Sequence, residues 1–182
     1  MRLLFPKPYA DFVARLRVPS GFALVAAFAW FSHPDARSLA YGLPVSVIGL
    51  AVRAWAAGHL AKNQSLAASG PYAYTRNPLY LGTLLVAAGL AVAARSVGLG
   101  ALFAAVFLCI YLPVIQLEQQ HLRGLFPDYA AYAARVPALL PRMTPAGQPR
   151  AFQWALYLKN REYQAAAGFL SGALFLFWKA LR

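Results

Sequence analysis

Long runs of apolar residues alternate with short polar stretches along the chain. Five runs approach the length of about 20 residues that an α-helix needs to cross the hydrocarbon core of a bilayer. They cover residues 18–31, 39–60, 79–94, 97–117 and 163–181. The first and third runs are short for a span. The pattern predicts an all-α, polytopic transmembrane helix bundle of about five spans, in a single domain over residues 1–182.

The composition agrees with lipid as the main solvent of this chain. Its 182 residues are 60% hydrophobic and 12% charged, whereas soluble domains are about 45–50% apolar and about 25% charged. Lys and Arg outnumber Asp and Glu by 17 to 5, so the net charge is +12. Nucleic-acid-binding proteins carry such charge on a polar scaffold, and we therefore expect no nucleic-acid partner. Cys109 is the single cysteine, which excludes an intrachain disulfide.

The distribution of the basic residues predicts the orientation in the membrane. With a cytoplasmic N-terminus, 12 of the 17 Lys and Arg residues lie on the cytoplasmic side. Cytoplasmic loops carry an excess of these residues, so the sequence predicts a multi-pass membrane protein with the N-terminus inside and the C-terminus on the far side. The connections 61–78 and 118–162 have two apolar runs between them and are therefore expected on the same, cytoplasmic face.

The first connection ends in a candidate anion-binding site. The stretch 57–82 reads AGHLAKNQSLAASGPYAYTRNPLYLG. Asn77 followed by Pro78 predicts the start of a helix, because proline is favoured in a first helical turn. The unpaired N–H groups of a helix N-terminus suit a carboxylate or phosphate, and Arg76 adds a cation beside them. The pattern fits a ligand site and a plain helix cap equally well.

The second connection opens with a predicted amphipathic segment. Residues 117–141 read LEQQHLRGLFPDYAAYAARVPALLP, with apolar residues at helical spacing. Gly124 and Pro127 are expected to separate the tail of the fourth helix from a short interfacial helix that begins near Pro127. Pro113, just before this segment, is expected to kink the fourth helix.

Arg53 and Glu118 are the ionisable residues that the pattern singles out. An ionisable group at membrane depth is costly and usually faces a cavity or a partner. Arg53, inside the second run, either extends to the headgroups or contacts an anion inside the bundle. Glu162 has Lys159 and Arg161 beside it in its own segment. Glu118 has no such local partner, so it either pairs with a distant cation or a ligand ammonium, or marks an exposed helix end.

Taken together, the two motifs resemble a known family. GPYAYTRNPLYLG is followed one span later by an acidic residue and then by L...F..Y..Y...VP..LP. This pair resembles the integral-membrane methyltransferases that include isoprenylcysteine carboxyl methyltransferases and phospholipid N-methyltransferases, over residues 53–141. The resemblance implies a helical enzyme without a Rossmann domain that uses S-adenosylmethionine and methylates a lipophilic or membrane-borne carboxylate, thiol or amine. Its cofactor would lie between the third and fourth spans and the following cytoplasmic segment.

The resemblance also implies a set of site residues. Asn77 stands where many members have His, and Gln119 replaces the second acid of a common Glu-Glu pair. The implied cofactor-binding residues are Arg76, Asn77, Pro78, Tyr80, Gly82, Glu118, Gln119, Tyr129 and Tyr132. The implied catalytic residues are Glu118, Arg53 and Arg135.

The expected roles within this set differ. Arg76 and the helix start at Asn77 would hold the carboxylate of the cofactor, and Glu118 would hold a polar or cationic part of it. Arg53 or Arg135 would face the methyl acceptor, for which an anionic or lipid-borne molecule is slightly preferred because the sequence is rich in arginine and poor in acids.

The residues also permit two other interpretations. A membrane reductase of the related sterol-reductase type would use NADPH, and the chain looks like the C-terminal half of such an enzyme. A non-catalytic scaffold would hold anionic lipid on its basic loops and would tolerate Glu118→Gln. The sequence contains no Walker loop or nucleophile elbow, and its three histidines have no spacing typical of a metal site.

Overall fold

In a computed structural model that describes residues 4–147 and 149–182, every regular element is helical. This confirms the predicted all-α class. The elements are α1 (Lys7–Phe31), α2 (Ala36–Ala57), the 3-10 turn η1 (Gly70–Ala73), α3 (Pro78–Ala93), α4 (Val97–Val106), the π-helical turn η2 (Phe107–Tyr111), α5 (Leu112–Leu125), α6 (Tyr129–Arg135), α7 (Trp154–Lys159) and α8 (Tyr163–Ala180).

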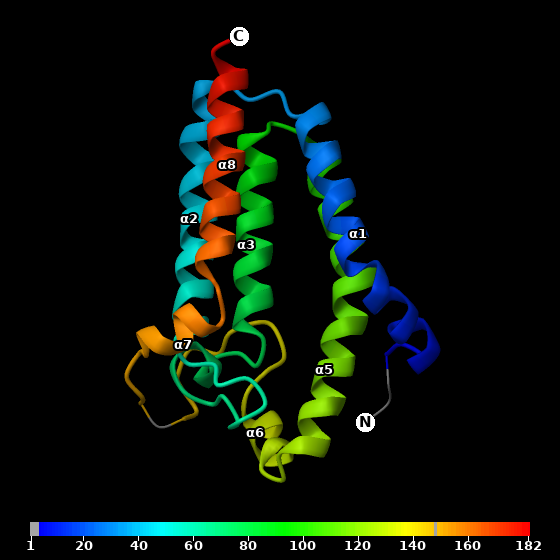
Figure 1. The fold of residues 1–182 in the computed structure, drawn as a ribbon, viewed down its shortest axis with the longest axis vertical. Helices are drawn as coiled ribbons and strands as arrows, with labels where there is room; N and C mark the ends of the chain where they lie inside the picture. Colours follow the sequence, from blue (N-terminus) through cyan, green and yellow to red (C-terminus); the bar gives the residue numbers. More distant parts are fainter. Residues whose placement is uncertain (1–3, 148) are drawn as a thin grey trace.

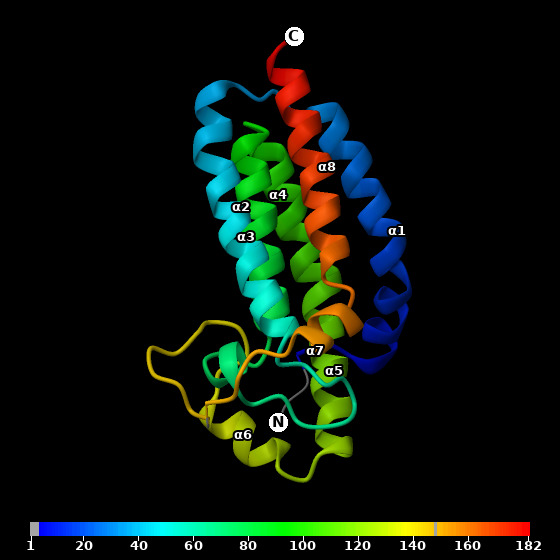
Figure 2. The same cartoon turned by 60° about the vertical axis from the view of Figure 1, so that its left-hand side comes forward.

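The long helices form a bundle of two parts. Helices α2 and α3 lie side by side, α8 packs against α2 and against the end of α1, and α1 packs along the continuous helix made by α4, η2 and α5 (Figures 1 and 2). The short helices α6 and α7 and the long connections gather at one end of the bundle, and the C-terminus lies at the opposite end (Figure 1). The two connections expected on one face therefore do share one end of the molecule.

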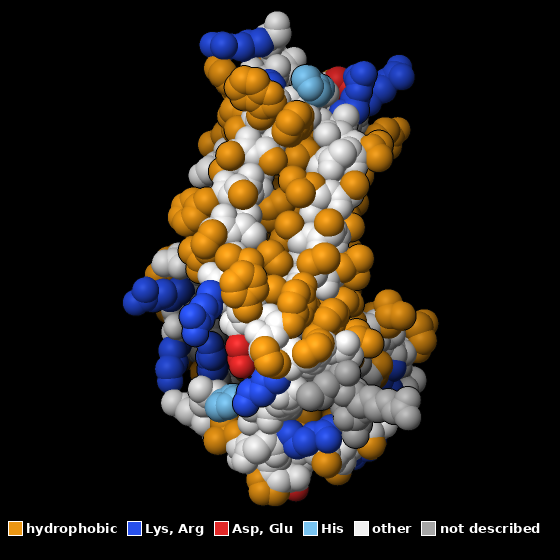
Figure 3. Space-filling model, turned by 90° about the vertical axis from the view of Figure 1, so that its right-hand side faces the viewer, with side chains coloured by type: hydrophobic (Ala, Val, Ile, Leu, Met, Phe, Trp, Pro, Cys, Tyr) orange, Lys and Arg blue, Asp and Glu red, His pale blue; other side chains and the backbone are white. Residues whose placement is uncertain are grey.

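Three helices are long and apolar enough to cross a membrane: α1, α2 and the helix Val97–Leu125 that comprises α4 to α5. Helix α3 is shorter, with 16 residues, and the 18-residue α8 is not among the three. The face that carries α1 and α5 is covered by hydrophobic side chains along its middle, with Lys and Arg gathered toward its two ends (Figure 3). These features are those of a membrane protein, whereas the count of five spans stays a prediction.

One predicted helix boundary is wrong. Helix α1 begins at Lys7, well before the predicted run 18–31, and continues through Pro19. Exposed basic residues interrupt the apolar pattern in this part of α1 without interrupting the backbone hydrogen bonds, which do not depend on side-chain polarity. The fourth helix ends at Leu125 and α6 begins at Tyr129, which confirms the division that the sequence predicts at Gly124 and Pro127.

Helices α2 and α3 approach closely because glycines face each other. A Cβ atom built on Gly49 would lie 2.6 Å from the carbonyl oxygen of Gly82. The Ser46 hydroxyl donates a hydrogen bond of 3.0 Å to the Val86 carbonyl across the same contact. Small residues that let two backbones meet are a common basis of helix association in membranes. The contact fixes Arg53, one turn beyond Gly49, against the first turns of α3.

The π-helical turn η2 lies just before Pro113, where the sequence predicts a kink. Proline has no N–H to donate to the carbonyl four residues earlier, which here belongs to Cys109. The Tyr9 hydroxyl of α1 donates to that carbonyl at 2.8 Å. Gln116, farther along α5, adds a second attachment by donating through Nε2 to the Phe5 carbonyl at 2.8 Å. The beginning of α1 is therefore fastened to α5 by polar contacts.

We expect Gly49→Ala to destabilise the protein by about 1–3 kcal/mol, because the added methyl group has no room against the α3 backbone. Gly168→Ala in α8 is the matched control, since a Cβ atom there meets nothing within 4 Å, and the better helix propensity of alanine should leave stability unchanged or raise it by up to about 1 kcal/mol. Thermal unfolding in detergent measures both. Equal midpoints for the two variants would contradict the close helix contact.

Candidate functional site

The two connections bind each other at one end of the bundle. The backbone N–H of Arg76 donates to the Pro137 carbonyl at 2.9 Å. The side-chain amide of Asn77 donates through Nδ2 to the Ala138 carbonyl at 2.7 Å. Asn77 thereby fastens the start of α3 to the chain that follows α6, and this bond occupies the side chain that the sequence assigns to a cofactor.

Helix α6 presents two buried tyrosines to the first connection. Tyr129 and Tyr132 form an apolar cluster with Val136, against which Leu66 and other partly buried residues pack. Burial raises the pKa of both tyrosines, so their hydroxyl groups stay protonated and act as donors. The Tyr132 hydroxyl donates to the Tyr72 carbonyl at 2.8 Å, which ties α6 to the turn η1.

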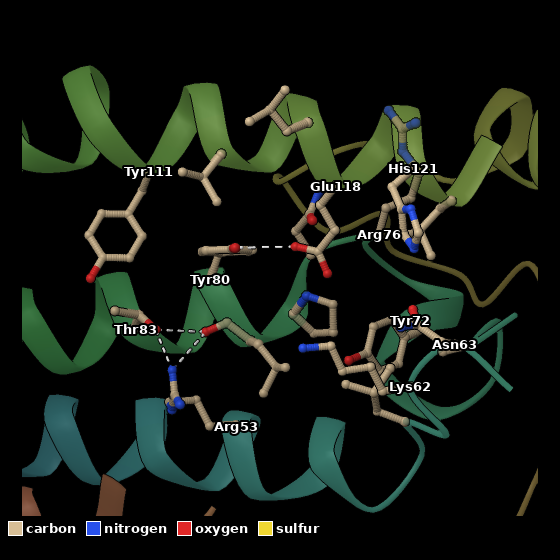
Figure 4. A pocket seen from close by; sticks show the side chains of 18 of the residues that line it. Arg53, Lys62, Asn63, Tyr72, Arg76, Tyr80, Thr83, Tyr111, Glu118 and His121 are labelled. Carbon is tan, nitrogen blue, oxygen red and sulfur yellow. Dashed lines mark hydrogen bonds between the residues drawn. The ribbon is translucent and has the colours of Figure 1, made fainter. Parts of the chain in front are cut away.

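Next to these paired connections lies a cavity of about 1040 Å³, with walls from α1, α3, α5, α6, the end of α2 and the loop after it. Ligand pockets commonly measure about 300–1,000 Å³, so this cavity has room for a cofactor and part of a second molecule. Figure 4 shows side chains from several of these elements converging on it. Eight residues expected from the sequence line it: Arg53, Arg76, Asn77, Pro78, Tyr80, Glu118, Tyr129 and Tyr132.

Glu118 points from α5 into this cavity toward α3 (Figure 4). The Tyr80 hydroxyl of α3 donates to Glu118 Oε2 at 3.2 Å. The ring of Tyr111, two turns before Glu118 on the same long helix, contacts the Tyr80 ring edge to face at a centroid distance of 6.1 Å. A carboxylate beside aromatic rings is suited to a cationic group of a ligand.

Arg76 and Tyr129 bring two unused donors to the cavity. Arg76 Nε and the Tyr129 hydroxyl are both buried, and neither has a hydrogen-bond partner among the described residues. The Arg76 cation lies near enough to Tyr129 to favour the ionised form of its hydroxyl, although burial is stronger and the net pKa is raised. Buried donors without partners are uncommon in proteins, and a carboxylate would satisfy both.

Arg53 pairs with Glu162, which corrects the expectation that Glu162 uses its neighbours Lys159 and Arg161. Arg53 Nε lies 2.5 Å from Glu162 Oε1, and its Nη1 donates to the Thr83 hydroxyl at the wall of the cavity. Glu162 is only 8% exposed. Arg53 therefore joins α2, α3 and the start of α8, and its charge is already balanced within the protein.

Three of the residues implied by the resemblance do not line the cavity. Gly82 is buried against Arg53 and Gly49, where its missing side chain lets α2 and α3 meet. Arg135 is exposed at the end of α6, and its Nε donates to the Ala131 carbonyl in its own helix at 3.3 Å. Gln119 follows Glu118 on α5 and therefore points away from the direction of that carboxylate.

Other cavity residues went unassigned in the sequence. On the long fourth helix, Tyr111 and His121 line the cavity together with Glu118. They lie two turns before and three residues after Glu118, and this helical spacing could have placed them on the same face in the sequence analysis. Tyr72 stands inside the quoted motif GPYAY, and burial raises its pKa. Lys62, from the loop after α2, and several residues of α1 also line the cavity, and no local pattern places them there.

The histidines form no metal centre in the described part of the chain. No group of three or more His, Cys, Asp or Glu residues there could hold a metal ion. His59 is buried, and its ring nitrogens contact the carbonyls of Trp55 at 2.9 Å and Arg150 at 3.0 Å. His59 therefore connects the end of α2 to the end of the second connection.

Comparison with known proteins finds related sequences. The family model described as phospholipid methyltransferase matches residues 43–129. The cobalt-zinc-cadmium resistance protein CzcN of Cupriavidus metallidurans is 37% identical over 105 residues, which are 57% of this chain and 47% of that protein. The chain thus matches about half the length of CzcN. The nickel-cobalt-cadmium resistance protein NccN of Alcaligenes xylosoxydans xylosoxydans is 30% identical over 151 residues, which are 76% of this chain and 71% of that protein. No solved structure matches.

We expect Glu162→Gln to lower stability by roughly 3 kcal/mol, because it leaves the half-buried Arg53 cation without its anion. The double variant Arg53→Met, Glu162→Leu should recover part of this loss, since it removes both charges. Asp35→Asn is the control: it breaks the exposed Asp35–Arg95 pair but keeps a side chain that caps α2, and stability should change little. Unfolding midpoints in detergent that are equal for the Asp35 and Glu162 variants would contradict this role of Arg53.

Proposed function

Because this chain belongs to the phospholipid methyltransferase family, we propose that it transfers a methyl group from S-adenosylmethionine to a lipophilic acceptor held at the membrane. The proposal is supported most strongly by two buried donors without partners, Arg76 Nε and the Tyr129 hydroxyl. They face the same cavity as Glu118 and Tyr80, and all four residues fall within the stretch 43–129 that the family model matches.

The donor set fits the amino-acid end of this cofactor. Arg76 and Tyr129 together offer a cation and a neutral hydroxyl to its carboxylate, and charge-assisted bonds of this kind are the stronger ones. Glu118 offers an anion to its ammonium group or a hydrogen-bond acceptor to its ribose hydroxyls. The rings of Tyr80 and Tyr111 lie beside Glu118 and can face a positive charge.

When bound, S-adenosylmethionine supplies a methyl group whose bond to sulfur breaks, leaving its electron pair on sulfur, as the acceptor atom forms its own bond to that carbon. The work left to the protein is to align the two molecules and to exclude water. The paired connections and the apolar helix faces supply walls that can serve this purpose. An anionic acceptor needs no base, whereas an amine would have to give up a proton, for which Glu118 is the nearest carboxylate in the cavity.

The metal-resistance names of CzcN and NccN do not change this proposal. They describe those proteins, and the part of this chain that the structure describes contains no group of side chains suited to a metal ion.

We expect Arg76→Gln to weaken S-adenosylmethionine binding by about 10- to 100-fold, because it removes a charged hydrogen bond to the carboxylate, and Tyr129→Phe to weaken it by about 2- to 10-fold. Glu118→Gln should weaken binding or abolish turnover while the protein stays folded. Isothermal titration in detergent measures binding, and methyl-labelled S-adenosylmethionine with a lipid extract measures turnover.

Asp128→Asn is the control for these titrations, since Asp128 is exposed at the start of α6 and makes no capping bond. It should bind the cofactor as the unaltered protein does. Binding of NADPH in place of S-adenosylmethionine would support a reductase instead. Absence of cofactor binding, together with no labelled product from several acceptor classes, would refute the proposal.

We also propose that all five long helical segments span the membrane, with the cavity end in the cytoplasm. Helices α3 and α8 lie alongside α2 (Figure 1), and most basic residues belong to the cavity end. In a Cys109→Ser background, Gln64→Cys should be labelled by a membrane-impermeant maleimide only in inverted vesicles, and His33→Cys only in cells or spheroplasts. Both positions are exposed. The reverse labelling pattern would refute this orientation.

A further inference from the structure

The α1 side of the cavity is formed by residues outside the family match. Five residues of α1 line the cavity: Arg17, Val18, Gly21, Phe22 and Val25. Their spacing of three and four residues places them on one face of the helix. The family model begins at residue 43, so this face is a feature of this chain that the family match does not cover.

The beginning and the end of this face of α1 differ in chemistry. Arg17 is a cation, and the residues that follow it toward the middle of the bundle are apolar. A Cβ atom built on Gly21 meets nothing within 4 Å, so open space borders α1 at this point. Phe22 and Val25 are large apolar side chains that follow Gly21 on this face, about one helical turn apart, and both are exposed. An apolar chain could therefore lie along α1 without displacing protein atoms.

The charge of Arg17 is not balanced by an ion pair. Neither of the two ion pairs among the described residues includes it. Arg17 lines the same cavity as Tyr80 and Glu118. An arginine in a helix that can span a membrane is costly and usually faces a cavity or a partner. A ligand anion would supply that partner.

The other cavity arginines have different uses. Arg53 is paired with Glu162, and the buried Nε of Arg76 is the donor assigned above to the cofactor carboxylate. Glu118 is the single acid among the residues that line the cavity, against the cations Arg17, Arg53, Lys62 and Arg76. The cavity therefore favours a second ligand with a negative charge, and Arg17 is the cation nearest to the apolar face of α1.

We propose that α1 forms the acceptor-binding wall: Arg17 pairs with an anionic head, carboxylate or phosphate, of an amphiphile whose apolar chain lies along Gly21, Phe22 and Val25. The word acceptor rests on the proposed function, whereas the binding of the anionic amphiphile does not. A lipid with a purely cationic head would be disfavoured by Arg17.

The first experiment tests the head group. The full chain in a neutral detergent is labelled with a diazirine derivative of palmitic acid and, separately, with the matching long-chain alcohol. The carboxylate should label the α1 face in preference to the alcohol by about tenfold, the factor that corresponds to one modest ionic contact. Arg17→Gln should reduce that preference to about twofold or less, and Arg17→Lys should keep most of it. Competition by hexadecyl phosphate distinguishes a phosphate head from a carboxylate head.

Arg15→Gln is the matched control, because Arg15 is an exposed arginine of the same helix that does not line the cavity. It should keep the tenfold preference. An unchanged preference in Arg17→Gln, an equal loss in Arg15→Gln, or labelled peptides that exclude α1 would overturn the inference.

The second experiment tests the path of the chain. Gly21→Leu fills open space without meeting protein atoms and replaces glycine by a better helix former, so the protein should fold. It should lower labelling by the palmitic acid probe by about tenfold and labelling by the butyric acid analogue, whose chain is too short to pass Gly21, by less than about twofold. Equal effects on the two chain lengths would overturn the proposed path.

Titration with S-adenosylmethionine separates this inference from the proposed function. Arg17→Gln and Gly21→Leu should bind the cofactor as the unaltered protein does, because their residues face the acceptor. If the unaltered protein binds no cofactor but its labelling depends on Arg17, the proposed function is wrong and the anionic-amphiphile site is correct. If the unaltered protein binds the cofactor but its labelling does not depend on Arg17, the anionic-amphiphile site is wrong and the proposed function stands.

Discussion

The close approach of α2 and α3 sets the geometry on which the cavity depends. Glycine at positions 49 and 82 lets the two backbones meet, and this contact holds Arg53 against the first turns of α3. Arg53 in turn binds Glu162 and Thr83, so the beginning of α8 is fixed to the same place. In lipid no hydrophobic force drives one apolar helix against another. Backbone contact and a balanced charge join these three helices.

The second half of the cavity is held by different forces. The chain before α1 and the first turns of α1 bind α5 through the carbonyl that Pro113 leaves free and through Gln116. At the end of the bundle, hydrogen bonds join the start of α3 to the segment after α6. The cavity lies where the two parts of the bundle meet these connections. Its position explains how Tyr80 of α3, Glu118 of α5 and Tyr129 of α6 can contact the same ligand.

Local sequence predicted the parts of the site that lie on short motifs. Arg76, Pro78 and Tyr80 follow one another at a helix start, and Glu118 and Tyr129 belong to a second short stretch of sequence, so each motif can be recognised locally. The packing of α3, α5 and α6 brings the two motifs together. The partner of Arg53 was out of reach of such reasoning, because Glu162 is 109 residues away and has nearer basic residues in sequence. Asn77 was expected at a ligand, yet its amide holds the backbone at Ala138. The contribution of α1 was also missed, since its basic residues interrupt the apolar pattern from which the helix was predicted.

The sequence by itself determined four things: that the apolar runs suit a lipid environment, that the chain is helical, that the two connections share one end, and which residues carry the motifs. Apolar run length and the spacing of side chains are local properties, and lipid leaves few structures other than helices for such runs. The tertiary structure alone decided which charges are balanced and which face the cavity. It paired Arg53 with Glu162, left the buried donors of Arg76 and Tyr129 without partners in the described chain, and placed Arg17 at the wall of the cavity. The physical reason is that the partner of a charge depends on how helices from distant parts of the chain pack. No local sequence pattern specifies that packing.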